Sequence, residues 1–255
     1  AVDEAIRHSI TKMSQLHFVS TEEYRRRVIQ MGEQPDTVYN VGALGVENVK
    51  NIRLLDREQL EKEINFKFSE KTVLVTFHPV TLEKMAAKEQ FSNLLKVLER
   101  HKELRIIFTK ANADTDGRII NEMIDDFAGK NKDRCVAYVS LGQLRYLSAV
   151  RQCCAVVGNS SSGIIEVPSF GIPTVNIGDR QRGRACAGSV ISCGNAIEEI
   201  QKALEEALSA DFYKAIQKMK NPYEGENTAQ TIYETINHKL QQGISLKKCF
   251  YNLKK

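Results

Sequence analysis

The stretch 155–184, AVVGNSSSGIIEVPSFGIPTVNIGDRQRGR, contains the side chains best suited to bind an anionic ligand. Ser160 and Ser161 stand in a Gly-Ser turn, where hydroxyl and backbone N–H groups can donate hydrogen bonds to phosphate oxygens. Glu166 follows about one helical turn later, and a carboxylate accepts hydrogen bonds from the two vicinal hydroxyls of a ribose. Arg180 adds a positive charge. These residue types predict a nucleoside diphosphate site, although an ordinary strand–helix turn explains the same spacing.

The elements that would position these residues follow from the same stretch. The apolar run 155–157 is typical of a buried parallel strand, and Gly158 ends it. Apolar residues at helical spacing over 164–170 predict a short helix, which Gly171 would terminate. A second buried strand is predicted over 172–177. The turn between the first strand and the helix therefore carries the candidate ligand-binding groups.

The rest of the chain alternates between predicted strands and helices. Ser20 and Glu23 form the pattern of a capping box at the start of one helix. The charged stretch 54–71 is a candidate connector between domains. Further strands are predicted over 16–20, 38–41, 72–77, 104–109 and 135–139, and helices over 3–15, 21–31, 82–101, 116–127, 141–150, 196–208, 213–219 and 228–240. This order predicts an α/β fold with a doubly wound parallel sheet.

Ligands in such sheets bind beyond the carboxyl ends of the strands, and polar residues stand at these positions. His78 follows the strand 72–77, Asn112 follows the next strand, and Ser140 follows the third. We expect them to share one edge of the sheet with the serine turn. His78 can equally be a structural hydrogen-bonding residue, and Asn112 an ordinary turn residue.

Composition excludes several classes of function. The 255 residues carry a net charge of only +4, with basic and acidic residues interspersed, which gives no footprint for nucleic acid. The six cysteines lack the spacing of a metal site or a disulfide framework, which favours buried free thiols in a reducing compartment. No apolar run is long enough for a membrane helix, and no signal peptide is visible. We therefore expect a cytoplasmic protein with no metal and no membrane partner.

Four segments in this order resemble the UDP-N-acetylglucosamine 2-epimerases. The matching segments are TFHPVT at 76–81, Asn112 with Asp114, GNSSSG at 158–163 followed by Glu166, and GDRQRGR at 178–184. The segments 3–12 and 41–46 match as well, so the resemblance covers essentially the whole chain. The His-Pro-Val-Thr segment is similar to the hydrolysing branch of the family, which acts in bacterial sialic acid synthesis.

The resemblance implies the GT-B architecture, in which two Rossmann-like domains enclose a cleft. By this comparison, residues 1–62 end the N-terminal domain, residues 63–220 form the UDP-binding C-terminal domain, and residues 221–255 form a terminal helix that crosses back. The chain opens without Met inside a helical pattern, so we expect that upstream sequence belongs to the protein. Without that part, the chain is expected to bind UDP weakly and to lack turnover.

The resemblance also implies a reaction, in which UDP-N-acetylglucosamine and water give N-acetylmannosamine and UDP through a 2-acetamidoglucal. No cofactor is implied, the partner is UDP-N-acetylglucosamine or UDP, and a homo-oligomer, either a dimer or a tetramer, is expected. Matched residue by residue, the implied catalytic residues are Asp3 and His78. The implied UDP-binding residues are His78, Asn112, Ser140, Ser160, Ser161, Glu166 and Arg180.

Three other functions are compatible with the same residues. A GT-B glycosyltransferase would share the UDP site but would need an acceptor sugar. A nucleotide-sugar sensor would bind the substrate without releasing UDP. A related epimerase would act on a UDP-diacetamido-trideoxy sugar.

Overall fold

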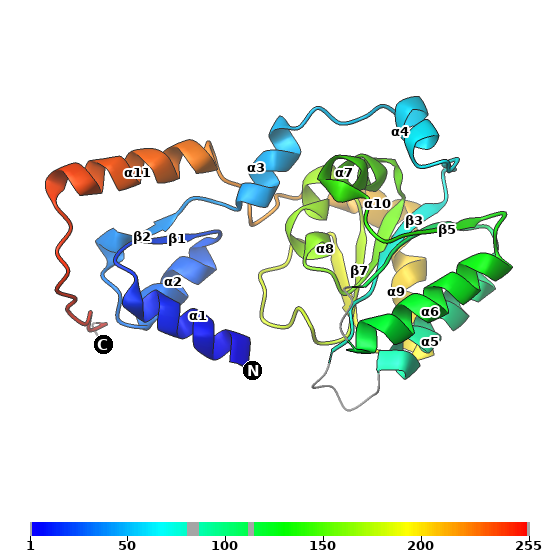
Figure 1. Cartoon of the computed structure of the whole chain (residues 1–255), viewed down its shortest axis with the longest axis horizontal. Helices are drawn as coiled ribbons and strands as arrows, with labels where there is room; N and C mark the ends of the chain where they lie inside the picture. The colour runs from blue at the N-terminus through cyan, green and yellow to red at the C-terminus, as the bar shows by residue number, and fades with distance from the viewer. Residues whose placement is uncertain (1, 81–86, 112–114, 254–255) are drawn as a thin grey trace. The chain divides into compact units, whose positions relative to one another are not determined.

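The computed structural model describes residues 2–80, 87–111 and 115–253, and it divides the chain into two compact units (Figure 1). Unit 1 comprises residues 1–51 and 222–255, and unit 2 comprises residues 52–221. The first segment of unit 1 thus ends at residue 51, eleven residues before the predicted end of the N-terminal domain at residue 62. The reason is packing: Leu60 and Ile64 are buried in the core of unit 2, so the helix that carries Leu60 belongs to that unit.

Unit 2 is built around a six-stranded sheet in the order β5-β4-β3-β6-β7-β8, in which all neighbouring strands are parallel. Counted along the chain, this is the strand order 3-2-1-4-5-6 of the Rossmann fold, with the topological switch point between β3 and β6. The strands are β3 (Thr72–Thr76), β4 (Arg105–Thr109), β5 (Cys135–Tyr138), β6 (Ala155–Gly158), β7 (Thr174–Ile177) and β8 (Val190–Cys193).

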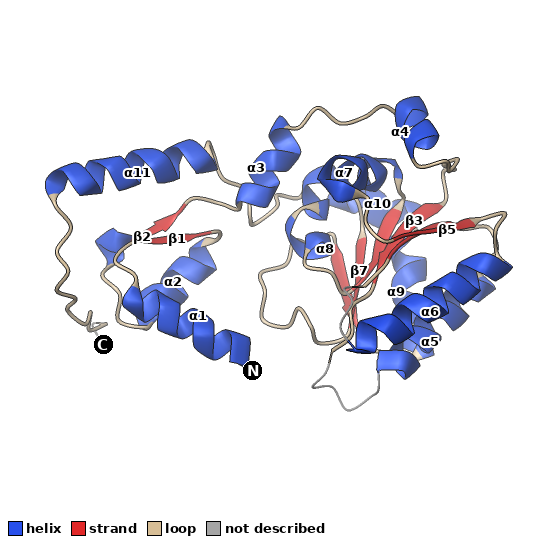
Figure 2. Cartoon of the chain, viewed as in Figure 1, coloured by secondary structure: helices blue, strands red, loops and turns tan. Residues whose placement is uncertain are grey.

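Helices cover both faces of this sheet (Figure 2). They are α4 (Arg57–Glu63), α5 (Ala87–Arg100), α6 (Thr115–Lys130), α7 (Gly142–Gln152), α8 (Ser162–Ile165), α9 (Ile197–Ala207) and α10 (Ala210–Ile216), with a 3-10 turn, η2 (Val167–Phe170), after α8. Gly171 ends this segment in the left-handed conformation, at φ 64°, as expected for a helix terminator. The first residues of the helix predicted over 82–101 lie outside the described residues.

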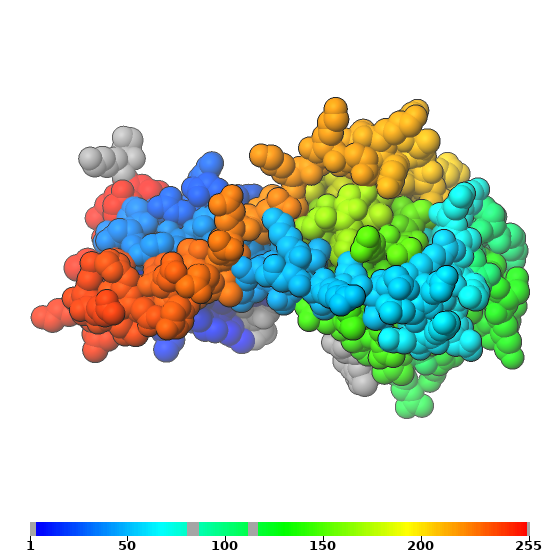
Figure 3. Space-filling view, turned by 90° about the horizontal axis from the view of Figure 1, so that it is seen from above, coloured from blue at the N-terminus to red at the C-terminus, as the bar shows by residue number. Residues whose placement is uncertain are grey.

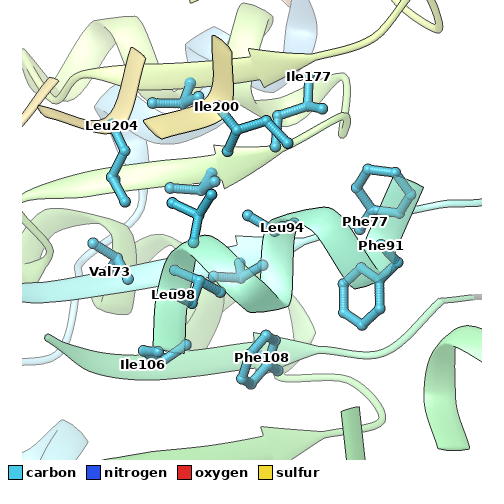
Figure 4. Packing of buried hydrophobic residues seen from close by; sticks show 14 of the residues in the cluster. Val73, Phe77, Phe91, Leu94, Leu98, Ile106, Phe108, Ile177, Ile200 and Leu204 are labelled. Carbon is cyan, nitrogen blue, oxygen red and sulfur yellow. The ribbon is translucent and has the colours of Figure 1, made fainter. Parts of the chain in front are cut away.

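The side chains of the central strands alternate between two separate cores, as the pleat of a strand requires. Val73 and Val75 of β3 face a cluster formed with α5, α6 and α9, where Leu98 and Leu204 are fully buried (Figure 4). Leu74, between them, faces the second cluster, formed with α4 and α7. The sheet is therefore doubly wound, as the alternation of predicted elements indicated.

Three local predictions differ from the structure. β8 was not predicted, because its four residues form an edge strand that is only partly buried. The helix α3 (Leu44–Asn51) is not among the predicted helices. The helix α2 (Glu22–Gln30) is capped by Thr21 rather than Ser20, since the Thr21 side chain accepts a hydrogen bond from the Tyr24 N–H.

Unit 1 combines the two ends of the chain. Its helix α1 (Val2–Met13) precedes a two-stranded parallel sheet, β1 (His17–Val19) and β2 (Val38–Asn40), with the 3-10 turn η1 (Pro35–Thr37) leading into β2. The C-terminal helix α11 (Thr228–Gln242) contacts α3, and the Thr228 hydroxyl donates to the Val41 carbonyl at 2.7 Å. In Figure 3 the orange and red C-terminal residues lie against the blue N-terminal ones.

Within unit 1, a buried carboxylate of the N-terminal segment binds the C-terminal tail. Glu33 is only 2% exposed and accepts hydrogen bonds from Lys12 at 2.6 Å and from Lys248 at 2.6 Å. His17 Nε2 lies 2.9 Å from the same carboxylate. Burial acts to raise the pKa of Glu33, but these hydrogen bonds outweigh burial and lower the pKa to about 2. Glu33 is therefore a charged centre that holds three segments together.

Within the described part of the chain, every helix is too short or too polar to cross a lipid bilayer.

Candidate functional site

The carboxyl ends of β3 and β6 meet at the switch point of the unit 2 sheet, where ligands bind in open α/β sheets. Thr76, at the end of β3, is paired with Gly158, at the end of β6. His78 follows β3 and is half-buried, and the serine turn, residues 160–163, follows β6. The topology thus brings together two segments that are about 80 residues apart in the chain.

Gly158 allows the two strand ends to approach each other. Its φ is +136°, a backbone conformation that side chains with a Cβ rarely adopt. A Cβ atom at this position would lie 1.9 Å from the Thr76 carbonyl oxygen. Only glycine fits this backbone position, so the residue that ended the predicted strand also sets the geometry of the site.

Asn159 joins the segments around the switch point. Its side chain is 1% exposed, and its Oδ1 accepts from the His78 N–H while its Nδ2 donates to the His78 carbonyl, both at 2.7 Å. Its own carbonyl accepts from Arg180 Nη1 at 3.0 Å and from Gln181 Nε2 at 2.8 Å. One buried residue therefore connects the ends of β3 and β6 with the loop after β7.

The serine turn leaves donors available for a ligand. The backbone N–H groups of Ser160 and Ser161 have no hydrogen-bond acceptor within the described ranges of the chain. Ser161 is the N-cap of α8, which is a single turn long, and both serines are half-buried. Free N–H groups next to serine hydroxyls are donors of the kind that can hold phosphate oxygens.

Glu166 lies where α8 ends and η2 begins, and it is half-buried. Among the described residues its carboxylate has no hydrogen-bond or ion-pair partner, so it is available as an acceptor. Its charge is felt by Tyr146: burial is the main cause that raises the pKa of Tyr146 to about 12, and the negative charge of Glu166 contributes. The buried hydroxyls of Tyr146 and Ser162 form no well-aligned hydrogen bond within the described part of unit 2.

A hollow of about 370 Å³ opens at the carboxyl ends of β3, β4 and β5, next to the switch point. Two threonine hydroxyls, those of Thr76 and Thr109, hydrogen-bond to each other in its wall. Its lining consists of Thr76, Thr109, Lys110, Val139, Ser140, Leu141, Gly142, Gln143 and Tyr146. The hollow thus combines apolar surface with hydroxyl and amide groups, a mixture found in small-molecule sites in general.

Arg180 supplies positive charge at the same edge, from the loop that follows β7. Burial lowers the pKa of Arg180 from its ordinary value, and the nearby Arg184 lowers it further. Arginine stays protonated at neutral pH despite such shifts. Its guanidinium is therefore a fixed cation, held to the serine turn through the Asn159 carbonyl.

The structure brings most of the predicted site residues to one edge of the unit 2 sheet: Ser140, His78, Ser160, Ser161, Glu166 and Arg180. Asn112 lies outside the described residues. Asp3 stands in the first turn of α1 in unit 1, and its side chain also lies outside the described part. Whether these residues bind a ligand remains a prediction.

Two residues of this edge were not singled out from the sequence. Asn159 stands in the sequence only as one residue of the segment 158–163, yet it connects three segments. Tyr146 was treated as part of a helix, yet it lines the hollow. Neither residue has a local signal in the sequence, because the role of each depends on contacts with distant segments. Among the described residues, no three His, Cys, Asp or Glu side chains lie close enough to hold a metal ion.

Comparison with known sequences finds one matching family and several similar proteins. The family described as UDP-N-acetylglucosamine 2-epimerase matches residues 1–237. A Campylobacter jejuni protein named GDP/UDP-N,N'-diacetylbacillosamine 2-epimerase (hydrolyzing) is 42% identical over 212 residues, which cover 83% of this chain and 55% of that protein. The Escherichia coli polysialic acid biosynthesis protein P7 is 38% identical over 252 residues, 98% of this chain and 64% of that protein. The chain thus spans less than two thirds of both relatives.

Solved structures share the fold. The Staphylococcus aureus MnaA–UDP co-structure has a TM-score of 0.72 at 14% identity and covers 95% of this chain and 64% of that chain. The Neisseria meningitidis UDP-GlcNAc 2-epimerase bound to UDP-GlcNAc has a TM-score of 0.65 at 17% identity, covering 90% of this chain and 62% of that one. These likenesses concern the fold alone, and they confirm the GT-B fold class and the α/β architecture expected from the sequence.

Proposed function

Because the chain belongs to the UDP-N-acetylglucosamine 2-epimerase family, we propose that it is the UDP-binding part of a hydrolysing 2-epimerase. The proposed enzyme converts UDP-N-acetylglucosamine and water into N-acetylmannosamine and UDP. The observation that supports this best is the switch point itself, where His78, the serine turn, Glu166 and Arg180 share one edge of the sheet. The His-Pro-Val-Thr segment and the word "hydrolyzing" in the name of the C. jejuni relative support the hydrolysing type.

In this proposal the nucleotide lies along the carboxyl edge of the unit 2 sheet. The uracil occupies the hollow beside Ser140, where backbone groups contact it. The ribose hydroxyls donate to the carboxylate of Glu166. The diphosphate accepts hydrogen bonds from the N–H groups of Ser160 and Ser161 and is balanced by Arg180. Asn112 is proposed as a further contact to UDP.

The chemistry begins with loss of UDP. A base removes the proton at C2 of the sugar while the C1–O bond breaks, which gives UDP and 2-acetamidoglucal. The serine turn, Arg180 and His78 stabilise the negative charge that develops on the leaving diphosphate. The oxygen of a water molecule then bonds to C1, and a proton adds to C2 from the opposite face, which inverts that carbon. Acid–base groups are needed on both faces, and Asp3 is proposed as one of them.

Turnover of UDP-N-acetylglucosamine alone tests this function. The full-length protein that contains this chain is expected to release N-acetylmannosamine and UDP in equal amounts, as measured by NMR. In D₂O the product is expected to carry deuterium at C2, because the new proton comes from solvent. Release of UDP only after an acceptor sugar is added would instead identify a glycosyltransferase, and binding without release would identify a sensor.

A second substrate is favoured by two relatives. The C. jejuni protein and a Legionella pneumophila protein, 32% identical to this chain, are named for N,N'-diacetylbacillosamine substrates. Parallel assays with UDP-N,N'-diacetylbacillosamine and UDP-N-acetylglucosamine decide between the two sugars, since the physiological substrate should have the larger kcat/KM. The homo-oligomer and the cytoplasmic location remain predictions.

The role proposed for Glu166 predicts a specific loss of affinity. Glu166→Ala should weaken UDP binding by about 1–3 kcal/mol, because the ribose hydroxyls lose a charged acceptor in a partly buried site. Isothermal titration calorimetry of this chain with UDP measures the change. Glu122→Ala, at an exposed position of α6 that pairs with Arg118, is the matched control and should bind UDP like the unaltered chain. Equal affinity of Glu166→Ala and Glu122→Ala would contradict the ribose role.

A further inference from the structure

We propose that Asn159 is the positioning residue of this site, and that it acts by holding His78 in the place where it meets the diphosphate. The role of His78 in this inference rests on the proposed function, whereas the contacts between Asn159 and His78 are observed in the structure. Asn159 is 1% exposed, so its side chain is not itself available to a ligand. It can act only through the residues that it holds.

The side chain of Asn159 binds both polar backbone groups of His78. Oδ1 accepts from the His78 N–H and Nδ2 donates to the His78 carbonyl, each at 2.7 Å. This pair requires a donor and an acceptor on one short planar side chain, which an amide provides. The next residue, Pro79, has no N–H, so an amide side chain could not form the same pair of hydrogen bonds there.

The backbone of Asn159 holds the other side of the site. Its N–H donates to the Thr76 carbonyl at 3.1 Å, which joins it to β3. Its carbonyl accepts from Arg180 at 3.0 Å and from the buried Gln181 at 2.8 Å. A shift of this residue would therefore move His78 and Arg180 together.

The competing explanation is that Asn159 stabilises the fold without any role in the site. Asn131 is an example of a purely structural asparagine. Asn131 is also a buried amide that uses both ends, since Nδ2 donates to the Phe127 carbonyl at 3.0 Å and Oδ1 accepts from Arg134 at 3.1 Å. It precedes β5 and so lies at the amino edge of the sheet, opposite the site. Its side-chain partners are buried residues away from the site, whereas the partners of Asn159 include two proposed ligand-binding residues, His78 and Arg180.

Calorimetric titration of this chain with UDP tests the inference by a double-mutant cycle. Asn159→Ala and Asn159→Asp should each weaken UDP binding by about tenfold or more, because the amide pair is lost or one of its bonds becomes repulsive. His78→Ala should cause a similar loss. Adding Asn159→Ala to His78→Ala should cost at most about threefold more, and Asn131→Ala should leave UDP affinity unchanged. The inference would be overturned if the fold-losses in UDP affinity of the two single variants multiplied in the double variant. An unchanged UDP affinity of Asn159→Ala would overturn it as well.

The ring resonances of His78, recorded by NMR without nucleotide, give a readout that does not depend on UDP. They should shift in Asn159→Ala and Asn159→Asp, and stay in place in Asn131→Ala. Unchanged resonances in both Asn159 variants would refute the positioning role. Asn159→Asp preserves the volume of the side chain, so the test can still be read if Asn159→Ala is destabilised. If the unaltered chain binds no UDP, the proposed function fails, and the resonances alone decide whether Asn159 positions His78.

Discussion

Replacement of Gly158 by alanine is expected to lower the free energy of unfolding of unit 2 by about 4 kcal/mol. A Cβ atom would lie 1.9 Å from the Thr76 carbonyl oxygen, and the φ of +136° is strained for alanine. The backbone strain costs on the order of 2 kcal/mol, and separating packed backbone atoms costs a similar amount. Because the strain falls on the pair Thr76 and Gly158, the ends of β3 and β6 should separate, and UDP binding should be lost with them.

Hydrogen exchange of the β3 and β6 amides measures this effect within the unit itself. Gly129→Ala is the matched control, since Gly129 is exposed on α6 and a Cβ there meets no atom within 4 Å. That substitution should stabilise α6 by up to about 1 kcal/mol, because alanine has the higher helix propensity. A Gly158→Ala chain as stable as Gly129→Ala would show that the strand ends can accept a side chain.

The second large effect is expected at Glu33. Glu33→Gln should lower the stability of unit 1 by about 3 kcal/mol at pH 7, because it removes a buried carboxylate that binds Lys12, Lys248 and His17. The pKa of Glu33 is about 2 in the folded chain, below its ordinary value of 4.5. Its contribution is therefore present above pH 4.5 and is lost as the pH falls to about 2.

His17 also lowers the stability of unit 1 as the pH falls. Burial lowers the pKa of His17 below its ordinary value of 6.5, although Glu33 partly opposes this. The unfolded chain therefore takes up a proton first as the pH falls below 6.5, which favours unfolding. Unaltered unit 1 should thus lose stability on acidification, first through His17 and then through Glu33.

Urea titrations at pH 7 and pH 3, read from the amide signals of β1 and β2, measure both effects. The difference between the unaltered chain and Glu33→Gln should shrink as the pH falls. Glu23→Gln is the control, since Glu23 forms an exposed ion pair with Arg27 and should change stability by less than about 1 kcal/mol. A loss in Glu33→Gln no larger than in Glu23→Gln would show that the tail does not depend on this charge.

Much of the fold could be predicted because its elements carry strong local patterns. The buried strands β3, β4 and β6 are apolar runs bounded by polar or glycine residues, and all three were predicted within a residue or two. β8 was not predicted, because an edge strand needs less apolar surface and its four residues therefore lack a distinct pattern. The unit boundary at residue 51 depends on where Leu60 is buried and not on the charged residues around it.

The residue types of the candidate site were readable for a different reason. Glycine, serine, glutamate and arginine at short spacing restrict the backbone and supply donors and a carboxylate, and these properties do not depend on distant residues. Asn159 was not recognised, because its value comes from His78, 81 positions earlier in the chain, and from Arg180, 21 positions later. Such contacts have no local pattern.

By itself, then, the sequence determined the doubly wound α/β class, the resemblance to a family, and the hydrogen-bonding groups that the turn after β6 carries. Only the tertiary structure decided that β3 and β6 are neighbours at the switch point, that His78 therefore stands beside the serine turn, and that Asn159 joins them. The physical reason is that propensity and hydrophobic periodicity act over a few residues. The order of strands and the hydrogen bonds between their ends arise only when the two cores are packed.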